Sequence, residues 1–408
     1  MSAAMTMRKS PFGSVAAAPP DPILGLTEKF NADTNPQRVN LGVGVYQDAS
    51  GKVPLLKAVH EAEKRLLESG GAKSYLPIDG LKTYDSAVQT LLFGAGSPII
   101  SEGRAVTIQA LGGTGGLKVG ADFLKRFVSE GAAPIYISDP SWENHRALFE
   151  MAGFDVRTYP YYGAETQSVR FAEMIETLTD LPAKTPVVLH ACCHNPTGLD
   201  LTPEQWQGVA ETCAARGLLP FLDFAYQGFA EGPEPDAYAV RLFAESGQPF
   251  LIAQSFSKSF SLYGERAGSL TIVGQDADEA KRVLSQLKRV VRTNYSSPAA
   301  HGGAVVATIL GDAELTALWE SELTVMRERI RQMRLLLVEK LRGAGVSRDF
   351  GFIAEQRGMF SYSGLTKAQA EQLRDEFHVY VVDSGRICVA ALNENNIETV
   401  CAAIAAVL

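Results

Sequence analysis

The sequence lacks the features that mark membrane, secreted or nucleic-acid-binding proteins. No apolar stretch approaches the roughly 20 residues that a membrane-spanning helix requires. No run of basic residues accompanies the formal net charge of −8, so we expect neither a nucleic-acid partner nor a membrane surface. The five cysteines are odd in number and irregularly spaced, which argues against a disulfide framework and favours the reducing cytoplasm.

The N-terminal segment also lacks the apolar core of a signal peptide. Arg8 and Lys9 are followed by PFGSVAAAPP at 11–20, where proline and glycine interrupt any helical pattern. We therefore expect residues 1–20 to form a flexible arm.

What the sequence does contain is a regular alternation of short apolar runs and longer helical patterns. Several apolar runs lack polar alternation, which is typical of strands buried on both faces. Helical patterns lie between them at 116–130 and 202–217; the second has Thr202 as N-cap, Pro203 at its first position and Gly217 at its end. Predicted strands are at 106–111, 134–139, 155–161, 186–192, 219–225, 250–256 and 268–273. This predicts an α/β fold with a mostly parallel sheet between helices, and ligands beyond the carboxyl ends of its strands.

A change of pattern near residue 320 indicates a second domain. A long amphipathic pattern at 318–343 leads into shorter mixed segments. A chain of 408 residues is too long for one ordinary core, so two domains are expected on length alone.

The segment after the strand predicted at 250–256 carries the strongest chemical signal. Lys258 lies there in an apolar setting between hydroxyl side chains. A desolvated lysine loses its proton more readily and becomes a nucleophile for a carbonyl carbon. Ser255, Ser257 and Arg266 suit a phosphate monoester, to which arginine presents a two-pronged fork.

Other strand ends carry weaker signals. The glycine-rich turn at 112–116 opens a helix and suits a phosphate, but an ordinary tight turn explains it as well. It matches neither a Walker loop nor a dinucleotide fingerprint.

Trp142 follows the next strand and either stacks on a flat ring or packs in the core. Asp223 lies within an apolar run and needs a partner, such as a protonated ring nitrogen, a buried cation or a cap, with Tyr226 close by.

The alternation of His190, Cys192 and His194 makes a metal site conceivable, because alternate residues of a strand share a face. No fourth ligand is evident and the run reads as buried, so we predict no metal.

Taken together, the strand ends offer a nucleophilic lysine, a phosphate cradle, a carboxylate for a ring nitrogen and a flat side chain to stack. Each signal is ambiguous alone. Their joint appearance matches what pyridoxal phosphate requires of a protein.

From Asp21 to the C-terminus, the chain resembles the class I, fold-type I aminotransferases of the aspartate/aromatic subgroup. The resemblance rests on NLGVGVY (40–46), SWENH (141–145), CCHNPTG (192–198), DFAYQGF (223–229), SFSKSFSLYGER (255–266), RTNYSSP (292–298) and SGRICVA (384–390). It implies a large cofactor-binding domain at 53–320 with a seven-stranded sheet, and a smaller α+β domain made of 21–52 and 321–408.

The resemblance also implies roles for residues around the cofactor ring. Lys258 would bind pyridoxal phosphate covalently and move the substrate proton. Asp223 would pair with the ring nitrogen, supported by His145. Tyr226 and Asn195 would bond the ring oxygen. Trp142 would stack on the ring, and the phosphate would be held by Gly113, Thr114, Ser255, Ser257, Arg266 and, from the other subunit of a homodimer, Tyr75.

Two arginines would bind the substrate. Arg386 would clamp its α-carboxylate, with Gly44, Trp142 and Asn195 nearby. Arg292, donated by the partner subunit, would bind the side-chain carboxylate of a dicarboxylic substrate. Asp383 stands where relatives usually carry a small apolar residue, so it either affects Arg386 or points to solvent.

The predicted activity is a ping-pong transfer of the amino group between tyrosine, phenylalanine or aspartate and 2-oxoglutarate. Stretches such as 107–126 and 355–365 resemble bacterial aromatic-amino-acid (tyrosine) aminotransferases. Around the pocket, Val53 and Ser297 are similar to the aromatic type, whereas Val45 and Thr114 are similar to the aspartate type. A strict aspartate aminotransferase is therefore the alternative. Decarboxylation or β-elimination on the same scaffold, and a non-catalytic binding protein, are the more distant ones.

Overall fold

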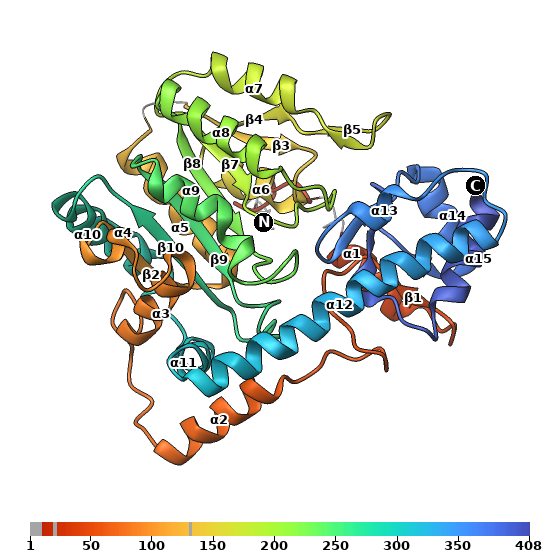
Figure 1. Cartoon of the computed structure of the whole chain (residues 1–408), viewed down its shortest axis with the longest axis horizontal. Coiled ribbons are helices and arrows are strands. Elements are labelled where there is room, and N and C mark those ends of the chain that lie inside the picture. The colour runs from red at the N-terminus through yellow and green to blue at the C-terminus, as the bar shows by residue number, and fades with distance from the viewer. Residues whose placement is uncertain (1–9, 19–22, 130–132) are drawn as a thin grey trace, which may run out of the picture.

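The computed structural model describes residues 10–18, 23–129 and 133–408. Its centre is a seven-stranded sheet (Figure 1) with the strand order β2-β10-β9-β8-β7-β3-β4. In chain order, the strands are β2 (Ala105–Leu111), β3 (Pro134–Asp139), β4 (Asp155–Pro160), β7 (Pro186–His190), β8 (Leu219–Phe224), β9 (Phe250–Ser255) and β10 (Ala267–Val273). Strand β10 is antiparallel to β2 and β9, and the other pairs of this sheet are parallel. The predicted α/β fold with a mostly parallel seven-stranded sheet is confirmed.

Two hydrophobic cores cover the two faces of the sheet. Side chains alternate along a strand, so in β8 Phe221 belongs to one core and Leu222 to the other. The Phe221 core contains residues of α5 (Gly112–Phe127), α6 (Glu143–Met151) and α10 (Ala277–Asn294). The Leu222 core contains residues of α3 (Lys82–Phe93), α7 (Phe171–Asp180), α8 (Pro203–Arg216) and α9 (Tyr238–Glu245). The sheet therefore lies between helical layers, and its strand ends remain free for a site.

Helix α8 has the predicted ends. The Thr202 side chain accepts a hydrogen bond from the Gln205 backbone, and the Gln205 side chain accepts one from the Thr202 backbone. Gly217 adopts the left-handed conformation, with φ of 60°.

Helix α5 begins earlier than the predicted 116, because the glycine-rich turn forms its first turn. A side chain there would collide with the sheet: a Cβ on Gly116 would lie 2.5 Å from the Ser269 carbonyl oxygen. The glycines thus allow close packing of the helix start against β9 and β10, although their intrinsic helix propensity is poor.

The C-terminal region packs with part of the N-terminal region at one end of the molecule (Figure 1). The parallel pair β1 (Val39–Asn40) and β12 (Val379–Tyr380) joins the two segments. Helix α12 (Ala313–Gly343) runs without a break across position 320. The region also contains α1 (Leu24–Ala32), α13 (Phe352–Glu355), β11 (Phe360–Tyr362), α14 (Lys367–Phe377), β13 (Arg386–Cys388) and α15 (Ile397–Val407). The exact domain limits stay a prediction.

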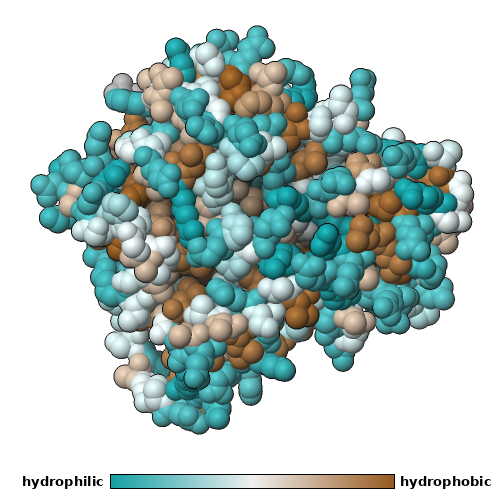
Figure 2. Space-filling model, viewed as in Figure 1, coloured by the Kyte–Doolittle hydropathy of each residue, from teal (hydrophilic) through white to brown (hydrophobic). Residues whose placement is uncertain are grey.

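The surface is mixed in character. Figure 2 shows a largely hydrophilic face with scattered hydrophobic groups. Within the described part of the chain, no helix combines the length and apolarity needed to cross a membrane. The predicted arm at 1–20 lies partly outside the described residues, and residues 10–18 are exposed and contain a turn. Two further helices, α2 (Lys57–Ser69) and α11 (Ala300–Leu310), lie against α12.

Candidate active site

A cavity of about 450 Å³ lies beyond the carboxyl ends of the parallel strands, as predicted for this sheet. All predicted site residues except Tyr75, Arg292 and the supporting His145 line it: Gly44, Gly113, Thr114, Trp142, Asn195, Asp223, Tyr226, Ser255, Ser257, Lys258, Arg266 and Arg386. These residues come from segments far apart in the sequence. The fold therefore brings together the groups that the strand ends supply one by one.

Lys258 follows β9 and is close to Tyr226. Its Nζ atom lies 4.7 Å from the centroid of the Tyr226 ring. Burial lowers the pKa of Lys258 to about 8, although the nearby Asp223 carboxylate acts in the opposite direction. The amine therefore reaches its neutral, nucleophilic form more readily than a surface lysine does.

Asp223 is the next-to-last residue of β8, lines the cavity and is 5% exposed. Its Oδ2 atom lies 2.8 Å from His145 Nε2, and His145 Nδ1 shares a hydrogen bond of 2.8 Å with Ser141 Oγ. Burial raises the pKa of Asp223, but the hydrogen bond from His145 and the electrostatic influence of nearby basic side chains outweigh burial, so the pKa falls below its usual value. The site thus holds a buried, ionised carboxylate that can accept a hydrogen bond from a protonated nitrogen.

His190 lies beside this pair and lines the cavity. Both of its ring nitrogens are buried and lack a hydrogen-bond partner among the described residues. Burial lowers the pKa of His190 to about 3, so the ring is neutral. Ligand atoms of His145, His190 and Asp223 lie within 4.8 Å of one another.

The residues considered as metal ligands from the sequence were His190, Cys192 and His194. The fold instead brings together ligand atoms of His145, His190 and Asp223. The ring nitrogens of His194 form hydrogen bonds with Ser138 and Thr197, each 2.9 Å long. Its ring stacks on Tyr161 at a centroid distance of 3.9 Å. These contacts give His194 a structural explanation, and they remove the basis for a site with His190 and Cys192.

The start of α5 and the Lys258 segment form a cradle for an anion. Arg266 Nη1 donates to the Tyr263 carbonyl oxygen at 2.9 Å and lies 3.5 Å from Ser257 Oγ. A Cβ on Gly112 would lie 2.6 Å from Arg266 Nη2, and one on Gly113 would lie 3.0 Å from Ser255 Cβ. The glycines thus let a helix N-terminus, two hydroxyls and a guanidinium converge, an arrangement that suits phosphate.

Arg386 also lines the cavity and is 1% exposed. Its Nη1 donates to Asn195 Oδ1 at 3.1 Å, and its Nη2 donates to the Gly42 carbonyl oxygen at 2.7 Å. The guanidinium lies 4.3 Å from the centroid of the Phe360 ring. A buried, oriented guanidinium of this kind can bind a carboxylate at the cavity wall.

Asp383 points away from this clamp. Its carboxylate forms ion pairs with Arg374 at 3.3 Å and with Lys367 at 3.8 Å. Of the two alternatives considered from the sequence, the structure therefore favours a surface position for Asp383.

The model of the aminotransferase class I and II family matches residues 36–404. The chain belongs to this family. It is 58% identical to the aspartate aminotransferase of Pseudomonas aeruginosa, over 97% of this chain and 99% of that protein. It is 52% identical to the aromatic-amino-acid aminotransferase of Escherichia coli, over 97% of this chain and 100% of that protein.

A solved structure of a family member is closely similar. The aromatic-amino-acid aminotransferase from Burkholderia pseudomallei, which is covalently bound to pyridoxal phosphate, superposes with a TM-score of 0.95 at 61% identity. The match covers 98% of this chain and 100% of that one. The predicted fold type and family resemblance are thereby confirmed.

Some residues of this aminotransferase site were not singled out from the sequence. Tyr263 lines the cavity, and its hydroxyl accepts a hydrogen bond of 2.9 Å from the Tyr46 backbone. Phe360 lies under Arg386. Both belong to segments quoted for the resemblance, but aromatic residues there read as core until the fold shows the cavity. Glu143, within SWENH, approaches Arg386 Nη1 at 3.5 Å.

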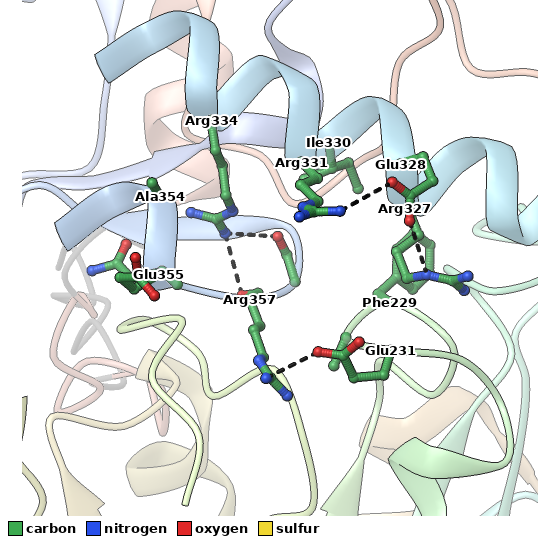
Figure 3. A pocket seen from close by; sticks show the side chains of 13 residues that line it. Phe229, Glu231, Arg327, Glu328, Ile330, Arg331, Arg334, Ala354, Glu355 and Arg357 are labelled. Carbon is green, nitrogen blue, oxygen red and sulfur yellow. Dashed lines mark hydrogen bonds and ion pairs between the residues drawn. The ribbon is translucent and has the colours of Figure 1, made fainter. Parts of the chain in front are cut away.

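A second cavity, of about 260 Å³, lies beside α12 and contains none of the predicted site residues (Figure 3). Its arginines already have partners. Arg357 pairs with Glu231 at 2.9 Å, and Arg331 lies 3.7 Å from Glu328. Arg334 reaches backbone carbonyl groups around Arg357. The arginines of this cavity therefore connect segments of the chain and are not available to a ligand.

Proposed function

We propose that this chain is a pyridoxal-phosphate-dependent aminotransferase that exchanges the amino group between an aromatic amino acid or aspartate and 2-oxoglutarate by a ping-pong mechanism. One observation carries the proposal: Lys258, Asp223, the Arg266 cradle and the Arg386 clamp face one cavity. A strict aspartate aminotransferase is the alternative.

The residues fit the cofactor. The cradle at the start of α5 would be filled by any Cβ on Gly112, and it suits the phosphate group. Asp223 would bond the ring nitrogen, Tyr226 and Asn195 the ring oxygen, and Trp142 would stack on the ring. When bound, the cofactor supplies a carbonyl carbon for the amino group and a ring that accepts electrons.

The chain's own groups then account for the reaction. Arg386 orients the substrate through its carboxylate, so the α-hydrogen is held at one place. Lys258 Nζ would take that proton and deliver it to the carbon that receives the amino group, and its lowered pKa of about 8 favours the neutral base. The carboxylate of Asp223, held by His145, would stabilise a proton on the ring nitrogen of the cofactor.

Both substrate classes have support. The relatives include an aspartate and an aromatic-amino-acid aminotransferase at similar identities. Apolar side chains such as Val43, Leu117 and Phe360 line the cavity and suit an aromatic ring. Arg386 serves either class, because both carry an α-carboxylate.

The first experiment mixes cofactor-loaded enzyme with phenylalanine or aspartate in the absence of an acceptor. We expect each amino acid to release about one equivalent of 2-oxo acid per site, with a change in the cofactor absorbance. Release from aspartate alone would favour the alternative. Lys258→Ala enzyme is the control and should release none at a comparable rate; near-normal turnover by it would refute the proposal.

We also infer a homodimer in which Tyr75 and Arg292 serve the partner's cavity. Both side chains are exposed, Tyr75 to 93%, and neither lines the cavity of its own chain. Exposed apolar residues on and before α2, namely Val53, Leu55 and Leu67, offer surface for such an interface.

Subunit complementation tests this arrangement. A mixed dimer of Lys258→Ala and Arg292→Leu chains has one complete site if Arg292 crosses the interface, and none if it acts within its own chain. Random re-association of equal amounts should therefore restore about one quarter of wild-type activity toward aspartate. No gain over the separate variants would contradict the shared site.

We further propose the division into a large domain at 53–320 and a small domain made of 21–52 and 321–408. The pairing of β1 with β12 supports it.

A cytoplasmic location is in keeping with five free, buried cysteines.

A further inference from the structure

Arg386 has one carboxylate neighbour among the described residues, and it belongs to the chain itself. Glu143 Oε2 lies 3.5 Å from Arg386 Nη1, the nitrogen that also donates to Asn195. Arg386 Nη2 donates to a backbone carbonyl oxygen, and Nε is buried without a partner. Among the described residues, Glu143 is thus the only ion-pair partner of this buried guanidinium.

The position of Glu143 follows from the start of α6. Trp142 is the N-cap and Glu143 the first helical residue, so the turn that places the indole also places the carboxylate. A negative charge at a helix N-terminus is favoured by the helix dipole. The Glu143 side chain remains 26% exposed, so its charge keeps part of its hydration.

Glu143 reaches the clamp from outside the cavity. Arg386 lines the cavity and Glu143 does not. A substrate carboxylate that binds Arg386 from within would share the guanidinium with this resident carboxylate, at a separation at which two negative charges still repel. The distance of 3.5 Å is at the limit of a hydrogen bond, so the resident pair is a weak one.

We propose that Glu143 is a resident counter-charge that stabilises Arg386 in the empty site and lowers the affinity of the site for every substrate. This inference rests on the proposed function, because it takes Arg386 as the α-carboxylate clamp. Glu143 acts through Arg386 and is a positioning residue. Because all substrates carry the α-carboxylate, it changes affinity for aromatic and dicarboxylic substrates alike, unlike Arg292.

The test replaces Glu143 with glutamine, which keeps the shape and removes the charge. Binding to the cofactor-loaded enzyme is measured by calorimetry with 3-phenylpropionate and succinate, which are phenylalanine and aspartate without their amino groups. We expect Glu143→Gln to bind both compounds roughly three- to tenfold more tightly, in keeping with a partly exposed ion pair. KM should fall by a similar factor for both amino acids, with kcat nearly unchanged.

The melting temperature of the enzyme without ligand should change in the opposite direction to its affinity for carboxylates. Without ligand, Glu143→Gln should melt at a lower temperature, because Arg386 loses its counter-charge, whereas the ligand-induced rise should be larger than in the wild type. Glu150→Gln on the same helix is the matched control, since among the described residues Glu150 forms an ion pair with Arg146 alone, at 3.4 Å, and it should change neither quantity.

The outcomes separate the inference from the proposed function. Unchanged or weaker binding of both carboxylates by Glu143→Gln would overturn the counter-charge. Tighter binding of one class alone would overturn its independence of the side chain. A wild-type enzyme that binds neither compound would overturn the proposed function and the inference together, whereas normal wild-type binding leaves the proposed function standing.

Discussion

Arg334 and Arg386 are both buried, at 2% and 1% exposure, and both contact Phe360, yet their surroundings differ. Arg334 donates to carbonyl oxygens of Ile353, Arg357, Gly358 and Phe360. Figure 3 shows the bonds to Arg357 and Gly358. Burial lowers its pKa to about 10, so it stays charged at neutral pH. Arg386 lies against the Phe360 ring, and its buried Nε has no hydrogen-bond partner in the part of the chain that the structure describes.

The difference separates an arginine that holds the fold from one that is available to a ligand. The Arg334 partners are backbone groups that cannot leave without local unfolding. Two of the Arg386 partners are side chains, Asn195 and Glu143, which can shift so that a substrate carboxylate reaches the same guanidinium. By holding the segment that ends in Phe360, Arg334 supports the ring on which Arg386 lies.

The largest effect is expected at the clamp. Arg386→Leu should lower kcat/KM by roughly a thousandfold for every substrate, because a bidentate, buried contact to the α-carboxylate is lost. Its unfolding free energy should change little, since leucine replaces a guanidinium that is poorly compensated in the empty site. Steady-state kinetics and denaturant unfolding give the two quantities. The kcat/KM of Arg386→Lys should lie between those of the wild type and Arg386→Leu, because lysine keeps the charge but lacks the two-pronged guanidinium.

Equal losses of stability and activity in Arg386→Leu would contradict this picture. Such a result would make Arg386 a structural residue like Arg334, and the α-carboxylate would need another partner in the cavity.

The reverse pattern is expected for Arg334. Arg334→Met should lower the unfolding free energy by about 2–3 kcal/mol, because several buried carbonyl groups lose their donor. The folded fraction should keep most of its kcat, with a modest rise in KM from a less firmly held Phe360. Arg331→Met on the same helix is the control; its side chain is 72% exposed, and it should be nearly neutral. A stable Arg334→Met enzyme with a large loss of kcat would reverse the distinction.

The two arginines also show what the sequence could and could not predict. The strands and the Lys258 segment were predictable, because buried parallel strands and a lysine in apolar surroundings leave local patterns. Arg386 was recognisable only through SGRICVA, since a single arginine otherwise reads as a surface charge. Arg334 lies in RERIRQMR, where several arginines alternate with apolar residues. Which of them is buried depends on contacts with residues 353–360, which no local pattern records.

The glycine-rich turn shows the same limit in another form. Intrinsic propensity placed the start of the helix after the glycines, whereas α5 begins at Gly112. The close approach of the helix to Ser269 and Arg266 decides this, and it is a tertiary contact. Likewise, the positions of Tyr75 and Arg292 relative to a partner chain stay predictions, because they depend on an interface.

The smallest effect is expected at Asp383, which is close to Arg386 in sequence but pairs with Arg374 and Lys367. Asp383→Asn should change the unfolding free energy by no more than about 0.5 kcal/mol, as is usual for exposed ion pairs. KM for phenylalanine and aspartate should stay within about twofold of wild type, because solvent screens the charge from the buried clamp. Kinetics at low and high salt provide the check. A larger, salt-dependent shift in KM would mean that Arg386 responds to charges beyond its direct contacts. The difference between Arg386 and Arg334 would then depend on distant charges as well as on the side chains in contact with Arg386.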